Sequence, residues 1–263
     1  MGKSSKEQVN RRQKNILCFM SNHPNITIDE LAETAGTSCI TIRRDINRMI
    51  ADKMVVRSAA GRFSLLHDPA FDERYFRHYS SQHAQKVAIA QAAIGLVSDG
   101  SIIGVDSSST CLEFGKLLLQ KKDITLITNN LFLPQYLMRH TSLHLDCVGG
   151  QVNLKNNSTE GPAACAEIAK FNYDCVFFSA GALDFSCGLS NAEPEGIDTK
   201  LAFLRNAAKR ILLLDSTKFG QKSYRNFLPL SEVSFVVTDD GILPGHLACL
   251  ERLKIPSLIA PLP

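Results

Sequence analysis

The sequence lacks any run of 18 or more apolar residues, which excludes a helix that crosses a bilayer. It begins Met-Gly-Lys-Ser-Ser-Lys-Glu-Gln, without the apolar core of a secretory signal. Its eight cysteines form no C-x-x-C pair and do not cluster with histidine, so the sequence predicts no metal site. Most of these cysteines lie in apolar runs, which is typical of reduced thiols. We therefore expect a cytoplasmic protein with no cofactor and no membrane partner.

Charge is unevenly distributed along the chain. The 263 residues suffice for one small domain and one of ordinary size, and a hydrophobic content of 44% supports a buried core. Residues 1–66 hold eleven Lys/Arg against six Asp/Glu, a net charge of +5, whereas the remainder holds 18 against 20, a net charge of −2. A basic head on a weakly acidic body indicates a polyanion as the partner of the head. An ordinary solvated surface is the alternative, and the helical pattern of the head favours the polyanion.

Three helices are predicted in this head. The first spans Val9 to Met20 and ends before a segment that contains proline. Thr27 and Glu30 form a capping box that opens a short second helix, which ends at about residue 34. Gly36 supplies the turn, and Ser38 caps a third helix that continues to about residue 53. Two short helices joined by a tight turn predict a helix-turn-helix, whose second helix enters the major groove of DNA.

The third helix has one apolar and one polar face. Ile42, Ile46, Met49 and Ile50 follow the spacing of a buried stripe. The opposite face carries residues of the kinds that contact bases and phosphates, with Arg43 on its flank. Ile40 also lies on this face, where a thymine methyl group or a small protein contact would account for it. Residues 39–44, near the start of the helix, are the better candidates for contacts with base edges.

Two short β-type runs follow the third helix. Residues 54–57 and 62–66 are separated by Ser58-Ala59-Ala60-Gly61, which predicts a hairpin and hence a winged helix. Arg57 and Arg62 flank this wing and are predicted to bind phosphates, the alternative being a hairpin that only closes the small core. The predicted DNA-binding residues are Ser38, Cys39, Ile40, Thr41, Arg43, Arg44, Asn47, Arg48, Arg57 and Arg62.

The third helix resembles that of the DeoR family of transcriptional regulators, whose signature is Ser-x-x-Thr-Ile-Arg-Arg-Asp-Leu. Here the segment reads Ser-Cys-Ile-Thr-Ile-Arg-Arg-Asp-Ile over residues 38–46, with Ile46 in place of leucine. The resemblance implies a winged helix-turn-helix head that binds double-stranded operator DNA.

Beyond the head, helical and strand patterns alternate. Residues 67–82 read as a linker, and residues 83–263 as an α/β domain. Helices are expected at 86–97, 111–119, 131–139, 163–171, 197–208 and 246–253, and strands at 101–105, 124–127, 143–148, 175–178, 211–214, 234–237 and 256–260. Short apolar strands alternating with helices predict a mostly parallel sheet that is covered on both faces.

Polar clusters follow the strands of this predicted sheet. In such folds ligands bind beyond the carboxyl ends of the strands. The hydroxyl groups of residues 107–110 precede a helix, and hydroxyls at a helix N-terminus suit a phosphate. Asp106 would repel a phosphate, so it is expected to face sugar hydroxyls, while Lys218 would neutralise the phosphate or bind a hydroxyl. Ordinary loop and cap chemistry is the alternative for each cluster taken alone.

The resemblance to the DeoR family extends from about Arg11 to Asp239. The sensor domains of this family are similar in fold to ribose-5-phosphate isomerase and carry an Asp-x-Gly-Thr-Thr loop, which here reads Asp-Ser-Ser-Ser-Thr over residues 106–110. The resemblance implies a phosphorylated sugar as the effector. The predicted ligand-binding residues are Asp106, Ser107, Ser108, Ser109, Thr110, Thr128, Asn129, Gly149, Gly150, Gly181, Asp184, Lys200 and Lys218.

Two classes of function fit the sequence. The first is a repressor of a carbohydrate-utilisation operon, a homo-oligomer that binds its operator under the control of a phosphorylated sugar. The alternative is a sugar-phosphate isomerase that carries a DNA-binding head, with Asp106, Asp184, Glu195 and Lys218 as candidate acid/base groups. Because no second carboxylate lies next to Asp184, we favour the regulator and predict no catalytic residue.

Overall fold

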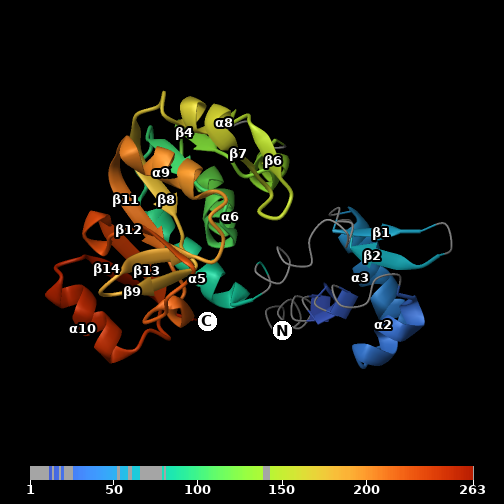
Figure 1. The fold of residues 1–263 in the computed structure, drawn as a ribbon. Coiled ribbons are helices and arrows are strands. Elements are labelled where there is room, and N and C mark those ends of the chain that lie inside the picture. Colours follow the sequence, from blue (N-terminus) through green and yellow to red (C-terminus); the bar gives the residue numbers. More distant parts are fainter. Residues whose placement is uncertain are drawn as a thin grey trace. The chain divides into compact units, whose positions relative to one another are not determined.

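The chain divides into two compact units, Met1–Ser80 and Ser81–Pro263, which are described separately (Figure 1). The computed structural model describes residues 12–13, 15–17, 19–20, 26–51, 54–58, 61–65, 79, 81–138 and 143–262. Most of the predicted linker, residues 67–78 and 80, lies outside the described residues, as does Val9. Within the described part, no helix has both the length and the apolar character that crossing a membrane requires.

The N-terminal unit is the predicted winged helix. Its described residues between 12 and 20 are helical, and α2 (Ile28–Thr34) and α3 (Cys39–Ala51) follow. Both halves of the capping box that joins Thr27 and Glu30 are present. The strands β1 (Val55–Arg57) and β2 (Phe63–Leu65) pair antiparallel, and Ile26 bridges to Phe63. The predicted hairpin is thus confirmed, with an additional bridge from the segment ahead of α2.

A single apolar cluster holds this unit together. Ile16 and Met20 of the first helix meet Leu31 of α2, while α3 contributes Ile42, Ile46 and Met49. Val55 and Phe63 add the hairpin to the same cluster. Burial of each such side chain contributes about 1.5–3 kcal/mol, which explains how so small a unit keeps a defined core.

The C-terminal unit contains a seven-stranded sheet in which every pair of neighbouring strands is parallel. The strand order is β14-β13-β11-β8-β3-β4-β5. In chain order these strands are β3 (Ile102–Val105), β4 (Ile124–Thr128), β5 (Leu143–Cys147), β8 (Tyr173–Phe178), β11 (Ala207–Leu213), β13 (Phe235–Asp239) and β14 (Ser257–Ala260). The predicted parallel α/β sheet is confirmed.

Helices cover both faces of this sheet. They are α5 (His83–Ala93), α6 (Ser109–Leu117), α7 (Phe132–Leu137), α8 (Gly161–Ile168), α9 (Ile197–Arg205) and α10 (Pro244–Arg252). Phe177 of β8 stacks on Phe114 of α6, with ring centroids 3.9 Å apart. The preceding residue, Val176, points to the other face, where Gly104 leaves room for Phe203 of α9. A side chain at position 104 would come within about 3 Å of both residues.

Five strands were missed by the sequence analysis. The strands β6 (Gln151–Asn153) and β7 (Ser158–Glu160) form a hairpin, and β9 (Ala182–Asp184), β10 (Gly188–Asn191) and β12 (Arg225–Leu228) form a small separate sheet. Each has only three or four residues, too few for an alternating pattern to be recognised. In the chain, both groups lie between strands of the main sheet.

Candidate nucleic-acid interface and ligand site

The recognition helix α3 presents the expected polar face. Ile40, Arg43, Arg44, Asn47 and Arg48 are exposed. Their apolar counterparts at positions 42, 46 and 49 are fully buried, and the one at position 50 is half-buried. This confirms the predicted orientation of the two faces of the helix.

The first turn of α3 is fixed by short-range hydrogen bonds. Ser38 Oγ accepts a bond from the backbone N–H of Thr41 at 3.3 Å, and the two hydroxyls lie 3.0 Å apart. Cys39 Sγ donates to Asp29 Oδ1 at 3.2 Å. This hydrogen bond, more than burial, raises the pKa of the Cys39 thiol. Among the predicted DNA-binding residues, Cys39 therefore faces α2, while the basic residues face outward.

Asp45 connects two helices of the N-terminal unit, a role that the sequence analysis missed. It is 2% exposed, and its carboxylate accepts a bond from Arg12 Nε at 2.6 Å and from Gln13 Nε2 at 3.3 Å. This ion pair ties the first helix to the recognition helix. The signal was present in the sequence, because Asp45 is spaced from Ile42 and Met49 as a residue of the buried face.

The wing carries both predicted arginines on its surface. Ser58 N–H donates to the carbonyl of Arg62 at 2.8 Å, which closes the hairpin. The guanidinium of Arg57 lies 5.8 Å from the ring centroid of Phe63. Both arginines are exposed, so they extend the positive surface of the unit beyond α3.

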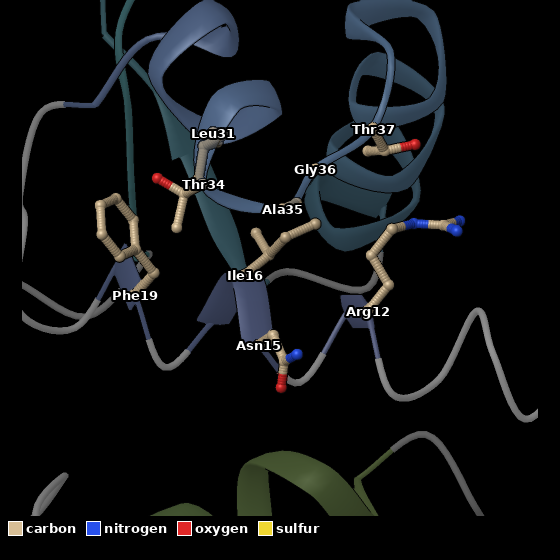
Figure 2. A pocket seen from close by; sticks show the side chains of 9 residues that line it. All are labelled: Arg12, Asn15, Ile16, Phe19, Leu31, Thr34, Ala35, Gly36 and Thr37. Carbon is tan, nitrogen blue, oxygen red and sulfur yellow. The ribbon is translucent and has the colours of Figure 1, made fainter.

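A cavity of about 330 Å³ lies between the first helix and the α2–α3 turn. Figure 2 shows Phe19 and Thr34 toward one end of it and Arg12 and Thr37 toward the other. Arg12 Nη2 is buried there and has no hydrogen-bond partner among the described residues. None of the predicted site residues lines this cavity.

In the C-terminal unit, Asp106 is the centre of the candidate ligand site. It is 3% exposed, and its Oδ1 accepts the N–H of Ser108 at 2.9 Å. Its Oδ2 accepts the N–H of Ser179 at 3.1 Å and forms an ion pair with Lys200. Lys200 Nζ also donates to the carbonyl of Ser179 at 2.8 Å. Both carboxylate oxygens thus have partners within the protein, and the predicted contact of Asp106 with sugar hydroxyls stays a prediction.

The charge state of Asp106 follows from this arrangement. Burial by itself would raise the pKa of the carboxyl group. The charge of Lys200 and the hydrogen bonds from Lys200 and Ser108 outweigh burial and hold the pKa below its usual range. Asp106 therefore stays ionised and binds together the ends of β3, β8 and the helix α9.

Hydrogen bonds also join the loops that follow β3 and β4. Thr128 Oγ1 donates to the carbonyl of Val105 at 2.7 Å, and Asn130 Nδ2 donates to the carbonyl of Ser107 at 3.2 Å. Ser108 Oγ caps α6 by accepting the N–H of Cys111 at 3.3 Å. In the same loop, Ser107 and Ser109 are half-buried and Thr110 is buried. The predicted loop lies at the helix N-terminus, and Asn130 is an additional residue that holds it in place.

Asn129 has an unsatisfied acceptor at this edge. Its Nδ2 donates to the carbonyl of Thr159 at 3.0 Å, and Asn129 is 3% exposed. Its Oδ1 is buried without a hydrogen-bond partner among the described residues. A buried acceptor of this kind suits a donor supplied by a ligand or by water, because leaving it unpaired costs about 1–3 kcal/mol.

The remaining predicted residues lie in several loops. Gly149 and Gly150 follow β5 and are exposed, and the N–H of Gly181 donates to Asn191 Oδ1 at 2.8 Å. Asp184 is at the end of β9, where the hydroxyl of Ser186, then backbone N–H groups, lower its pKa to about 2. The bridge between Leu183 and Phe219 brings this strand beside Lys218. The carboxylate of Asp184 accepts bonds from Ser186 and Cys187, whereas that of Asp106 accepts bonds from Ser108 and Ser179.

Lys86 is a further residue that sequence reasoning missed. It lies in the first turn of α5, and it is only 4% exposed. A helix that precedes a strand of a parallel sheet runs antiparallel to it, so its N-terminus lies at the carboxyl edge. Burial lowers the pKa of Lys86 to about 8; the carboxylate of Asp215 opposes this shift and the charge of Lys218 adds to it. The sequence feature that could have indicated its burial is a single lysine directly ahead of the apolar run Val-Ala-Ile-Ala.

The sequence matches two family models, the DeoR-like helix-turn-helix domain over residues 12–65 and the DeoR C terminal sensor domain over residues 81–240. An uncharacterized HTH-type transcriptional regulator of Haemophilus influenzae is 29% identical over 248 residues, covering 93% of this chain and 94% of the relative. The L-fucose operon activator of Escherichia coli is 27% identical over 87% of this chain and 94% of its own. The repressor AccR of Agrobacterium fabrum is 27% identical over 88% and 89%.

These relatives are named as transcriptional regulators and not as enzymes, in agreement with the sequence-based choice of a regulator over an isomerase. Among solved structures, ribose 5-phosphate isomerase A of Methanocaldococcus jannaschii superposes with a TM-score of 0.38 and 18% identity. This superposition covers 53% of this chain and 55% of that one.

Removal of the Asp45 carboxylate should destabilise the N-terminal unit. Asp45→Ala leaves the charge of Arg12 partly buried and uncompensated, which we expect to cost about 2–3 kcal/mol in the free energy of unfolding. Urea denaturation of the full chain, followed through the transition of the N-terminal unit, measures this loss. Glu33→Ala is the control, since Glu33 is an exposed carboxylate of α2. Equal stability of the two variants would contradict the role of the ion pair.

Lys86 should make the stability of the C-terminal unit depend on alkaline pH. Its pKa is about 8 in the folded chain, against an ordinary value of 10.5 for a lysine in water. Between these values the unfolded chain binds a proton that the folded chain does not, so the free energy of unfolding rises with pH. Below pH 8 the full penalty applies. Lys86→Met should therefore stabilise the protein at pH 7, by about 1–3 kcal/mol.

Denaturation curves from pH 7 to 10.5 test this expectation. The stability difference between wild type and Lys86→Met should shrink as the pH rises. Lys170→Met is the matched control, because the Lys170 side chain is 67% exposed. If the free energy of unfolding of Lys86→Met rises with pH as steeply as that of wild type, another group causes the pH dependence.

Proposed function

Since the chain belongs to the DeoR family of transcriptional regulators, we propose that it is a repressor of a carbohydrate-utilisation operon. The head binds operator DNA, and a phosphorylated sugar bound by the sensor unit controls that binding. Among the relatives reported above, AccR is named as a repressor and the L-fucose protein as an operon activator.

The exposed face of α3 is the observation that carries the proposal. Arg44 and Asn47 point directly away from the buried stripe, and Arg43 and Arg48 flank them. Arginine forms bidentate bonds with guanine and asparagine with adenine, and the flanking cations suit phosphates. An exposed helix with this composition at the second position of a helix-turn-helix is suited to the major groove. The two wing arginines add phosphate contacts.

The carboxyl edge of the parallel sheet supports the sensor half of the proposal. The hydroxyl-rich loop 107–110 stands at the N-terminus of α6, and Lys86 and Lys218 supply positive charge at the same edge. Asn129 supplies a buried acceptor for a hydroxyl donor. Donors for a phosphate together with acceptors for hydroxyl groups are what a sugar phosphate requires.

Control of DNA binding requires that the effector bind two states of the protein with different affinity. The Asp106–Lys200 ion pair makes such a difference possible, because it couples three segments that surround the proposed site. A homo-oligomer, a dimer or larger, would place two heads on half-sites spaced by whole turns of DNA. The effector would then change how well both heads engage together.

Fluorescence anisotropy of the purified protein on its own promoter DNA tests the proposal. The titration is repeated with a panel of sugar phosphates at fixed salt, because phosphate contacts make the affinity depend on salt. Release by one compound is the expected result. Specific binding that no compound affects would reject the phosphorylated sugar, and absence of specific binding would reject the regulator.

Arg44→Ala should weaken specific DNA binding by about 1–3 kcal/mol, because it removes a side chain from the centre of the exposed face. Effector binding should remain intact. Anisotropy titrations measure the first quantity and calorimetry the second. Arg252→Ala, an exposed arginine of α10, serves as the control. Unchanged operator affinity of Arg44→Ala would mean that another face of the helix meets DNA.

Lys218→Ala should weaken the response to the effector while DNA binding survives. Loss of its charge removes one of the cations at the proposed phosphate position, so a higher effector concentration is needed for release. The half-maximal concentration in the anisotropy assay measures the change, with Lys170→Ala as the control. Loss of DNA binding in Lys218→Ala would show instead that the residue supports the fold.

A further inference from the structure

We propose that Ile40 determines operator specificity by contacting the 5-methyl group of one thymine in each half-site. The proposal rests on the DNA-binding function proposed above, and it assigns a particular base-reading role to one side chain. It starts from an apolar residue in a position where the neighbouring side chains are cationic or amide-bearing.

Ile40 is 81% exposed, whereas the isoleucines at positions 16, 26, 42 and 46 of the same unit are at most 4% exposed. A single exposed apolar side chain is common on protein surfaces and carries no argument by itself. The argument comes from its place on α3, next to the groups that are suited to DNA.

The spacing of Ile40, Arg44 and Asn47 puts them on one line along the helix, at positions i, i+4 and i+7. This line lies opposite the buried residues Ile42 and Met49. Arg43 and Arg48 lie on its two sides. A helix that docks with the cationic flanks on the two phosphate backbones therefore directs the central line, including Ile40, at the base edges.

In the first turn of α3, the side chains on both sides of Ile40 are held by hydrogen bonds within the protein. Cys39 is held by Asp29, and Thr41 is held by Ser38. Of residues 39–42, which form this turn, Ile40 is the one that is exposed, whereas Cys39 and Thr41 are half-buried. In helix-turn-helix proteins this end of the recognition helix contacts base edges.

The apolar character of the Ile40 side chain determines which base it can contact. The side chain of isoleucine neither donates nor accepts a hydrogen bond, so it cannot read the donors and acceptors of guanine, cytosine or adenine. The thymine methyl is the apolar group that the major groove presents. Arg44 is suited to guanine and Asn47 to adenine, so the three residues would read different bases along one line.

The test compares thymine with deoxyuridine, which differs only by the methyl group. Operators are first selected from random DNA with the full-length protein, and each thymine is then replaced in turn. Wild type should lose about 3- to 10-fold in affinity at one position of each half-site, as expected for one buried methyl group. Ile40→Ala should bind the two DNAs equally, while Ile40→Val should keep a reduced preference.

Val152→Ala is the matched control, since Val152 is an exposed apolar residue of the sensor unit. It should discriminate as wild type does. Specific binding in which wild type ignores every thymine methyl, or in which Ile40→Ala keeps the preference, would overturn the role of Ile40 and leave the regulator intact. Failure to select any sequence would overturn the DNA-binding proposal, and this inference with it.

Discussion

The ion pair between Asp106 and Lys200 connects residues 94 positions apart in the sequence and lies almost completely out of water. Burial of two charges costs several kcal/mol per ion unless attraction and hydrogen bonds offset it. Here the backbone of Ser108 and Ser179 completes the set of bonds around the carboxylate. The loops after β3 and β8 are therefore held against α9 by a polar junction in addition to apolar packing. Such a junction has a defined geometry, which a site for a small polar ligand requires.

The N-terminal unit uses the same device on a smaller scale. Asp45 and Arg12 are 33 residues apart, and their bond connects the first helix to the recognition helix. The apolar cluster alone would tolerate small rotations of α3, since apolar contacts have little directional preference. A charge-assisted hydrogen bond of 2.6 Å is directional, so it restricts such rotations. The direction in which the exposed face of α3 points is thus set by a buried carboxylate within the recognition segment itself.

Local patterns predicted those parts of the structure that local forces determine. The capping box at Thr27, the turn at Gly36 and the two faces of α3 follow from periodicity and cap chemistry. The parallel sheet follows from apolar runs of sufficient length. The strands of the β6–β7 hairpin have three residues each, and tertiary hydrogen bonds join β7 to the segments after β4 and β5. The sequence likewise predicted polar loops at the strand ends. Both Asp106 and Lys200 were predicted to bind the ligand, but their pairing was not predicted, because that pairing depends on tertiary structure.

Lys86 and Ile40 lie in environments that do not match the polarity of their side chains, in opposite ways. One is a cation buried at the edge of a sheet, and the other is an isoleucine exposed on a basic helix. Burial of Lys86 works against folding, because it disfavours the charged form of the lysine. Exposure of Ile40 works against solubility, because it leaves apolar surface in water. Departures of this kind concentrate where a protein meets its ligands, since binding there can offset a cost that folding alone does not. One lies in each unit, at the place where that unit is proposed to bind its own partner. The two binding events that a regulator must couple therefore have separate chemical origins in this chain.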